Sequence, residues 1–201
     1  MYELKDNELV FAKVKPNAII PTKRDEDAGY DIYACFEEDF MVIPANETKL
    51  VPTGIASAMT DKWYLQVEER GSTGVKGIKK SAGVIDSGFR NEIFIAITNA
   101  NSNDMVISKL SKEKLIKRYG KKDEFEDIVL DYGDKKQMIY LVDTDESDFY
   151  NMSAIIYPYS KAIAQLVVHE VPKMEVNEIS YEELLAIPST RGVSMLGGSG
   201  K

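Results

Sequence analysis

Cysteine and histidine are almost absent from this chain of 201 residues, which contains one of each. Because a disulfide needs two cysteines, Cys35 cannot form one within the chain, which fits a reducing compartment. The same scarcity excludes zinc sites built from several cysteines or histidines. His169 lies in the apolar run Val167–Val171, which favours a structural strand position over a catalytic dyad. Carboxylates, arginines, hydroxyls and glycine backbone remain, and they suit metal-assisted attack of water on a phosphate.

Long apolar runs and an excess of positive charge are also missing. No apolar run approaches the roughly 20 residues of a membrane-spanning helix, so we expect no membrane segment. The start, Met1–Asp6, lacks an apolar stretch, so we expect no signal peptide and predict a cytoplasmic location. Lys and Arg number 25 against 33 Asp and Glu, a net charge of -8 that disfavours nucleic-acid and membrane-surface binding. An anionic substrate therefore needs local basic residues and a divalent cation.

Short β-rich runs separated by turn signals make up most of the chain. With 44% hydrophobic residues, the chain is long enough for one sizeable core. We expect strands within residues 9–14, 30–36, 49–59, 62–68, 92–98 and 162–171. Many short strands at close spacing favour a sandwich or barrel, and among these a jelly roll. The prediction is a single all-β domain over residues 1–201.

Residues 101–157 differ from this pattern. They combine a helical pattern at Ser111–Tyr119 with acidic runs and interleaved aromatic residues. We interpret them as a small α/β insertion, which is either a loop elaboration or a lobe that contacts a protein partner or another copy of the chain. Residues 189–201 are rich in glycine and poor in packing residues, which predicts a flexible C-terminal arm.

The stretch Gly83–Arg90 carries the most chemical information. Asp86 follows a predicted strand and precedes a Ser-Gly turn. Its carboxylate could activate a water molecule, worth roughly 10²–10⁴-fold in rate, or could cap its own turn. The Phe89 ring could form a wall against a base or sugar, or belong to the core. Arg90 could bind an anion, pair with a neighbour or lie on the surface.

Two further clusters suit phosphate chemistry. In Arg70–Gly77, three glycines accompany basic and hydroxyl residues, which predicts a phosphate cradle of backbone amides; an ordinary helix start is the alternative. Asp31 follows Gly29 at the start of a predicted strand, where its carboxylate could hold a hydrated Mg²⁺ or bond neighbouring amides. Arg191 begins the glycine-rich arm and could close over a polyphosphate or stay solvated.

Five segments, taken together and in order, resemble the motifs of the trimeric dUTPase (dUTP nucleotidohydrolase) family. The family patterns AGxD, RSGLAxKxG, GVIDxDYRGE, GDRIAQL and RGxGGFGSTG are similar to Ala28–Asp31, Arg70–Gly77, Gly83–Glu92, Ser160–Leu166 and Arg191–Gly200. Residues 101–157 lie outside the usual pattern, and some phage enzymes carry an insertion there, so the chain resembles a phage-like member. The resemblance implies a distorted β-barrel of the jelly-roll type that assembles as a homotrimer with sites at subunit boundaries. It also implies Mg²⁺-dependent hydrolysis of dUTP to dUMP and pyrophosphate, in the host cytoplasm if the protein is phage-encoded.

The resemblance also implies roles for single residues. Asp86 would orient and deprotonate the attacking water, and Asp31 would lie near the metal and phosphates through water. Arg70, Ser72 and Gln165 would contact phosphates, and Arg191 would clamp the terminal phosphate from another subunit. Residues 83–89 would read uracil, and the Phe89 ring would exclude a 2′-hydroxyl. The predicted substrate-binding set is Arg70, Gly71, Ser72, Thr73, Gly83, Val84, Ile85, Phe89, Gln165, Arg191, Leu196 and Gly197.

Several positions depart from the family patterns. Phe89 stands in place of a tyrosine and keeps the ring. Residues 71–74 read Gly-Ser-Thr-Gly, so either Ser72 or Thr73 could supply the hydroxyl that contacts phosphate. Ala162 replaces an arginine, and Leu196 replaces a phenylalanine that covers uracil, so we expect a looser lid.

Two alternative functions follow from the same residues. A nucleotide-binding regulatory protein of the same fold would act on a protein partner through residues 101–157. A dCTP-acting relative is the other alternative, because dCTP deaminases share the fold and an Ile-Asp-x-Gly turn. Those enzymes carry a catalytic glutamate ten residues beyond the aspartate, and Ala96 stands at that position here, which argues against deamination.

Overall fold

Short strands form nearly all of the regular structure in the computed structural model, which describes residues 2–111, 114–115, 130–132, 135–137, 154–190 and 192–193. The first seven strands are β1 (Val10–Lys13), β2 (Gly29–Ile32), β3 (Phe40–Ile43), β4 (Thr48–Pro52), β5 (Ile55–Ala58), β6 (Trp63–Glu68) and β7 (Ile78–Lys80). The others are β8 (Val84–Ile85), β9 (Phe94–Asn99), β10 (Asp104–Ser108), β11 (Leu130–Tyr132), β12 (Lys135–Gln137), β13 (Ala154–Pro158) and β14 (Ala164–Glu170). In the described part of the chain, the helices whose two ends are both described are α1 (Gly71–Gly74) and α3 (Tyr181–Ala186), each short. The all-β prediction is confirmed.

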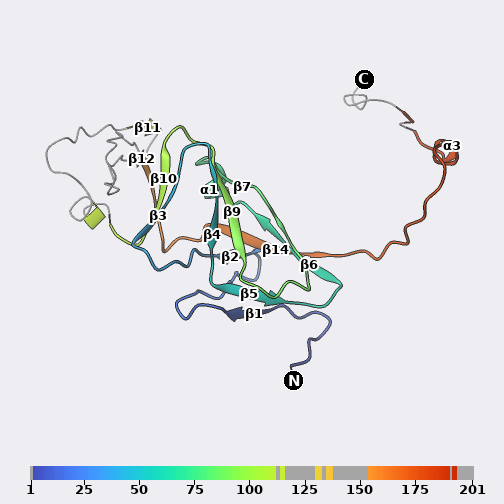
Figure 1. Cartoon of the computed structure of the whole chain (residues 1–201), viewed down its shortest axis with the longest axis horizontal. Coiled ribbons are helices and arrows are strands. Elements are labelled where there is room, and N and C mark those ends of the chain that lie inside the picture. Colours follow the sequence, from blue (N-terminus) through green and yellow to red (C-terminus); the bar gives the residue numbers. More distant parts are fainter. Residues whose placement is uncertain are drawn as a thin grey trace. The chain divides into compact units, whose positions relative to one another are not determined.

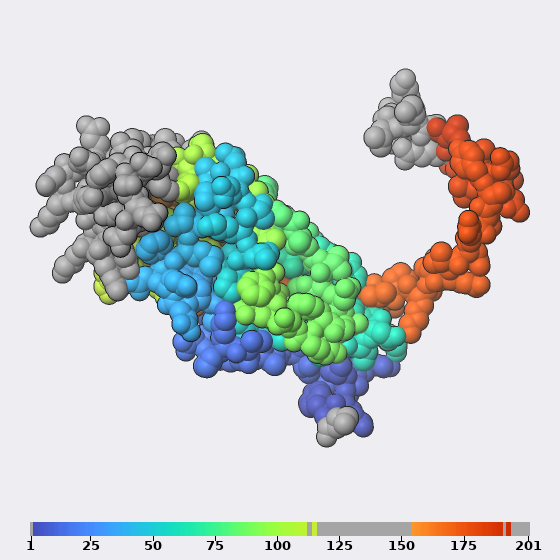
Figure 2. Space-filling model, viewed as in Figure 1, coloured from blue at the N-terminus to red at the C-terminus, as the bar shows by residue number. Residues whose placement is uncertain are grey.

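The strands form several small sheets (Figure 1), and most of them contribute side chains to one apolar core. Their orders are β2-β14-β6-β8, β4-β9-β7, β13-β10-β3, β1-β5 and β11-β12. Alternation along the strands directs one face inward: in β6, Leu65 and Val67 are buried while the residues between and beside them are partly exposed. The core also includes Ile32, Ile95 and Leu166 from three other strands. In the space-filling view, the segments coloured blue to green pack into one continuous body (Figure 2).

The ends of the predicted insertion are part of the main body. β10 pairs in parallel with β13 and antiparallel with β3, and Met105, Ile107 and Tyr157 belong to the core. The predicted insertion, residues 101–157, therefore includes at each end a strand that packs in the core of the main body. These strands were missed because β10 is buried along most of its length and neither strand shows the strict alternation of a half-exposed strand. At the predicted helix start, the Lys114 amide donates to Ser111 Oγ and the Leu115 amide to the Ser111 carbonyl. The rest of that helix lies outside the described residues.

Two other strand predictions needed correction. The run predicted over residues 49–59 is two strands, because Gly54 has a positive φ of 66° and breaks the run between β4 and β5. The strand predicted over 30–36 ends at Ile32. His169 lies in β14 as expected, and its ring stacks on Tyr64 with 5.3 Å between centroids.

The chain divides into two compact units, Met1–Val171 and Pro172–Lys201. In the second unit, α3 begins at a capping box in which the Ser180 and Glu183 side chains each bond the other's backbone amide. The sequence analysis did not predict this helix. Of the predicted arm, residues 189–190 and 192–193 are described, whereas Arg191, Leu196 and Gly197 lie outside the described residues. Among the described residues, no helix has the length and apolar character needed to cross a membrane.

Candidate active site

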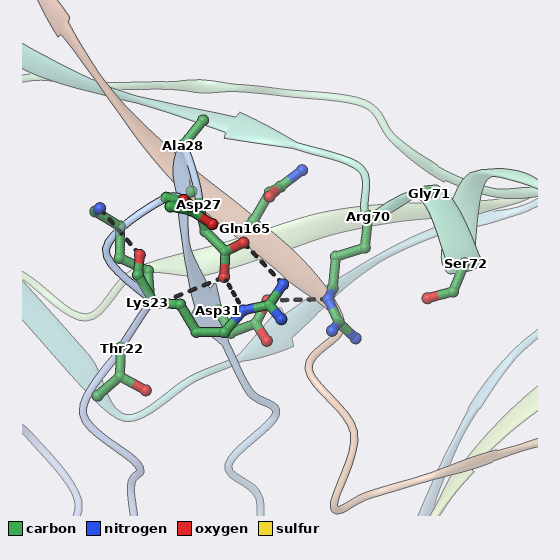
Figure 3. Close-up of a pocket in the computed structure, with 12 residues that line it drawn as sticks. Thr22, Lys23, Asp27, Ala28, Asp31, Arg70, Gly71, Ser72 and Gln165 are labelled. Carbon is green, nitrogen blue, oxygen red and sulfur yellow. Dashed lines mark hydrogen bonds and ion pairs between the residues drawn. The ribbon is translucent and has the colours of Figure 1, made fainter.

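An open cavity of about 700 Å³ lies where three segments of the first unit meet (Figure 3). The segments are the loop before β2 with β2 itself, the turn after β6, and the start of β14. Strand register brings them together, because Gln165 in β14 lies opposite Asp31 on one side and Glu68 on the other. The cavity is lined by Thr22, Lys23, Arg24, Glu26, Asp27, Ala28, Gly29, Asp31, Arg70, Gly71, Ser72 and Gln165.

Asp31 and Arg70, which both line the cavity, form an ion pair. Arg70 Nε lies 2.9 Å from Asp31 Oδ1, and both side chains are about one third exposed. Figure 3 shows the two side chains directed toward one another. Arg70 Nη1 also donates to the Ala162 carbonyl, which accepts a second hydrogen bond from the Tyr157 hydroxyl at 2.7 Å. Burial raises the pKa of Tyr157, so its hydroxyl remains a donor at neutral pH. The guanidinium is therefore fixed but still reachable by an anion.

Gln165 and Gly29 form the adjoining wall. Gln165 Nε2 donates to the Glu69 carbonyl at 2.9 Å, which ties β14 to the turn that carries Arg70. A Cβ atom at residue 29 would lie 2.5 Å from Gln165 Oε1 and 2.9 Å from Gln165 Cβ. The glycine of the Ala-Gly-x-Asp segment is therefore required because Gln165 occupies the space where a side chain would lie.

The predicted phosphate cradle is one turn of helix, α1, so the helix-start alternative describes its backbone. The two candidate hydroxyls differ in this turn. Thr73 is buried, and its hydroxyl donates to the Arg70 carbonyl and accepts from the Arg70 amide. Ser72 instead lines the cavity together with Gly71. A Cβ on Gly71 would meet no atom within 4 Å, so close packing does not require glycine there. Ser72 is thus the hydroxyl placed for an anion, and Thr73 stabilises the turn.

Residues 83–90, called the Asp86 hairpin below, lie elsewhere on the same sheet. Asp86 is exposed directly after β8, and the Phe89 amide donates to its carbonyl at 3.1 Å. Arg90 Nη1 donates to the carbonyls of Ser87 at 2.5 Å and Phe89 at 3.2 Å, so this guanidinium stabilises the turn. The Phe89 ring is 43% exposed and stands clear of the core.

Register separates this hairpin from the cavity within one chain. Ile85 pairs with Leu65 near the start of β6, whereas Arg70 follows the end of β6. Asp86 lies one residue further from the cavity, opposite Tyr64. About six residues of chain therefore separate the position of Asp86 along β6 from Arg70. At about 3.3 Å per residue this is roughly 20 Å. None of the residues 83–90 lines the cavity. One chain therefore gathers Asp31, Arg70, Gly71, Ser72 and Gln165, and does not bring Asp86 to them.

A metal ion would find few ligands here. Among the described residues, no group of three or more His, Cys, Asp or Glu side chains is placed to hold one. Mg²⁺ commonly keeps several waters and binds through one or two carboxylates plus substrate phosphates. Asp31 at the cavity wall fits that role, so the donor set suits a hydrated ion that arrives with a phosphate chain.

Sequence reasoning missed the charged loop before β2. Lys23, Arg24 and Asp27 line the cavity but were not predicted site residues. The signal was present as an unbroken charged run, Lys23–Asp27, directly before the Ala-Gly segment. Such a run is ordinarily a solvated surface, and only the fold shows that it borders the cavity.

An all-β scaffold that holds a guanidinium, a carboxylate and an amide around an open cavity is suited to a phosphorylated nucleotide with its metal ion. The dUTPase family model matches residues 15–112. The chain is 33% identical over 99 residues to the deoxyuridine 5′-triphosphate nucleotidohydrolase of Leptospira interrogans, covering 47% of this chain and 68% of that protein. It is 35% identical over 116 residues to the enzyme of the same name from Clostridioides difficile, covering 56% and 76%. This chain therefore belongs to the dUTPase family.

Solved structures agree on the fold. The dUTPase of Staphylococcus bacteriophage 80alpha aligns with a TM-score of 0.64 at 20% identity, over 97% of this chain and 99% of that one. The dUTPase of S. aureus phage phi11 aligns with a TM-score of 0.57 at 19% identity, over 86% and 96%. The prediction of a dUTPase-like fold with a phage-like architecture is confirmed.

Proposed function

We propose that this protein hydrolyses dUTP to dUMP and pyrophosphate as a Mg²⁺-dependent enzyme. The observation that carries the proposal is the relationship to two dUTP nucleotidohydrolases at 33% and 35% identity, each aligned over at least two thirds of its length. The cavity supports it, because a guanidinium and an amide beside an exposed hydroxyl suit a triphosphate on a chain of net charge -8.

In the proposed mechanism, the residues that line the cavity bind the phosphates, and the segment around Asp86 activates water and contacts the sugar. Arg70, Ser72 and Gln165 bind the phosphate chain, and Asp31 holds the hydrated Mg²⁺ that arrives with it. The ion, when bound, neutralises phosphate charge and withdraws electrons from phosphorus. Asp86 accepts a proton from the attacking water and orients it toward a phosphorus atom. The exposed Phe89 ring packs against the deoxyribose, where a 2′-hydroxyl would clash. Arg191, Leu196 and Gly197 would close the site over the bound nucleotide.

We also propose that the active form is a homotrimer with shared sites. The support is the separation of roughly 20 Å between Asp86 and Arg70 along one sheet. A water activated at Asp86 cannot reach a phosphate held at Arg70 of the same chain, so the hairpin of a second copy must complete each cavity.

Subunit mixing tests this arrangement. Arg70→Ala damages the phosphate half and Asp86→Asn the water-activating half, so each variant alone should be nearly inactive. When the two are unfolded together and reassembled as mixed trimers, about one quarter of the shared sites contain both intact halves. The expected dUTPase activity is therefore about one quarter of wild type. Sites built within single chains would give no recovery, and that outcome would refute the shared site.

Product analysis tests the reaction itself. The protein is incubated with Mg²⁺ and, separately, dUTP, dCTP, dTTP or UTP. We expect pyrophosphate from dUTP alone, and a loss of at least about 100-fold for Asp86→Asn. Ammonia released from dCTP would instead identify a deaminase, which Ala96 argues against. Unreacted dUTP at saturating Mg²⁺ would end the proposal.

A regulatory role through the inserted segment is the second candidate. The bacteriophage 80alpha dUTPase shares this fold. Phage dUTPases of that kind control transfer of virulence genes by a proto-oncogenic G protein-like mechanism. Removing residues 101–157 would delete β10 and β13, so the test deletion should span residues 112–153. Because these strands are parallel, the replacement linker must run back along β10, which takes about eight glycine and serine residues. A deletion variant that keeps both dUTPase activity and all protein partners would remove this candidate.

A further inference from the structure

The loop before β2, residues 22–28, holds an arginine at the cavity in a fixed position. Arg24 Nε lies 2.8 Å from Asp27 Oδ2, and Arg24 Nη2 lies 2.9 Å from Asp27 Oδ1, which makes a two-pronged pair. The Arg24 amide also donates to Asp27 Oδ2 at 3.3 Å, and the Asp27 amide donates to the Arg24 carbonyl at 3.1 Å. These four hydrogen bonds close a small ring, so the guanidinium is oriented although its side chain is 88% exposed.

Arg24 belongs to a series of alternating charges along the cavity wall. Asp27 pairs with Arg24, and Asp31 pairs with Arg70. The pKa of Arg24 is raised mainly by its hydrogen bond to Asp27 and to a lesser extent by Asp31, so Arg24 also lies in the field of Asp31. The two cations differ in depth, because the Arg70 side chain is 30% exposed and the Arg24 side chain 88%. Both cations therefore line the same cavity, and Arg24 is the more solvent-accessible of the two.

We propose that Arg24 is a further polyphosphate-binding residue of this site, positioned by Asp27. The inference rests on the proposed function, since it assigns the same cavity to the triphosphate. A guanidinium binds phosphate oxygens with two parallel N–H donors, as it now binds the two oxygens of Asp27. The Asp27 carboxylate therefore has two opposed effects: it orients the guanidinium, and it competes with phosphate for the same donors.

These opposed effects separate ligand binding from a purely structural role. If the Arg24–Asp27 pair only maintained the loop, removing either partner would loosen the cavity wall and weaken anion binding in both cases. If Arg24 binds phosphate, Arg24→Ala weakens binding. Asp27→Asn then strengthens it, because the amide keeps one acceptor for the guanidinium while a negative charge leaves the site.

The test is a calorimetric titration with inorganic tripolyphosphate and Mg²⁺ at low salt. Arg24→Ala should raise Kd about five- to tenfold, a value between those of exposed ion pairs and charge-assisted hydrogen bonds. Asp27→Asn should lower Kd about two- to threefold. The charge-matched control is Lys49→Ala, in β4 and away from the cavity, which should change Kd less than twofold. All differences should shrink at about 0.5 M salt, since the Debye length falls below about 5 Å.

Three results would overturn the proposal: no tripolyphosphate binding by the unmodified protein, an unchanged Kd in Arg24→Ala, or equal weakening in both loop variants. A parallel dUTP turnover assay distinguishes this failure from failure of the proposed function. Tripolyphosphate binding that follows the expected pattern without dUTP turnover would sink the dUTPase proposal and keep Arg24. Normal dUTP turnover with an unchanged KM and Kd in Arg24→Ala would sink only the role of Arg24.

Discussion

Replacing Gly29 by alanine should damage this protein through a single steric contact. The new Cβ would lie 2.5 Å from Gln165 Oε1 and 2.9 Å from both Gln165 Cβ and Cδ. The amide end can rotate away, but Gln165 Cβ is attached to the β14 backbone, which is paired with β2 in fixed register. The two strands must therefore separate by several tenths of an ångström. Overpacking of this kind costs about 1–3 kcal/mol.

Thermal unfolding gives the first measurement. In a chain of this length, 2 kcal/mol corresponds to a decrease in Tm of about 4–8 °C. The matched control is Gly74→Ala, where the nearest atom to the new Cβ would be Glu69 Cβ at an ordinary 3.8 Å. That variant should be neutral or slightly stabilised, because alanine has the higher helix propensity. Displaced Gln165 should also raise KM for dUTP in Gly29→Ala.

A second background tests the assigned cause. Gln165→Gly removes Cβ together with the Oε1 and Cδ contacts, so Gly29→Ala should cost less than half as much in that background. This non-additivity is expected for residues in direct contact. Equal Tm decreases in both backgrounds, or a Gly74→Ala variant as unstable as Gly29→Ala, would refute the steric reasoning.

Three further outcomes follow from the described contacts. Phe89→Ala should relax discrimination between dUTP and UTP about tenfold or more while Tm changes little, since the ring is 43% exposed; unchanged kcat/KM ratios would remove its sugar-sensing role. Because burial raises the pKa of Tyr157, its contribution to stability is complete below about pH 10 and lost as pH rises toward the folded-state pKa. Tyr157→Phe should therefore lower Tm at pH 8, and the difference from wild type should shrink by pH 11; a constant difference would contradict this. Glu92→Ala should cost about 2–3 kcal/mol in denaturant unfolding, because buried Glu92 accepts a hydrogen bond from the Gly54 amide and forms an ion pair with Lys15; Glu92→Gln, which keeps an acceptor, should cost less.

The β content followed from the sequence because half-buried strands leave a local trace. Leu65 and Val67 alternate with polar neighbours in β6, and turn residues separate the runs. Strands β10 and β13 left no such trace, because neither shows an alternating pattern of burial and their pairing partners lie far apart in sequence. An apolar run of that kind is compatible with several structures until its neighbours are known.

The site residues likewise fall into those that the sequence indicated and those that only the fold identified. Residue types and their order along the chain were enough to propose Asp31, Arg70 and Asp86, because the chemistry of phosphate hydrolysis restricts which side chains serve, and the resemblance to the family motifs added Gln165. The amino-acid sequence did not show whether the hydroxyl of Ser72 or that of Thr73 faces the cavity. It also gave no reason to select Arg24 as a site residue.

What the sequence determined by itself was chemical: no disulfide within the chain, no metal site built from several histidines, short strands, and the carboxylates and arginines available for catalysis. What only the tertiary structure decided was proximity. Register across β2, β14 and β6 set Gln165 between Asp31 and Glu68 and required glycine at position 29. It also placed Asp86 near the opposite end of β6 from Arg70. Pairing between distant strands is set by the packing of a shared core, and no local run of residues encodes it.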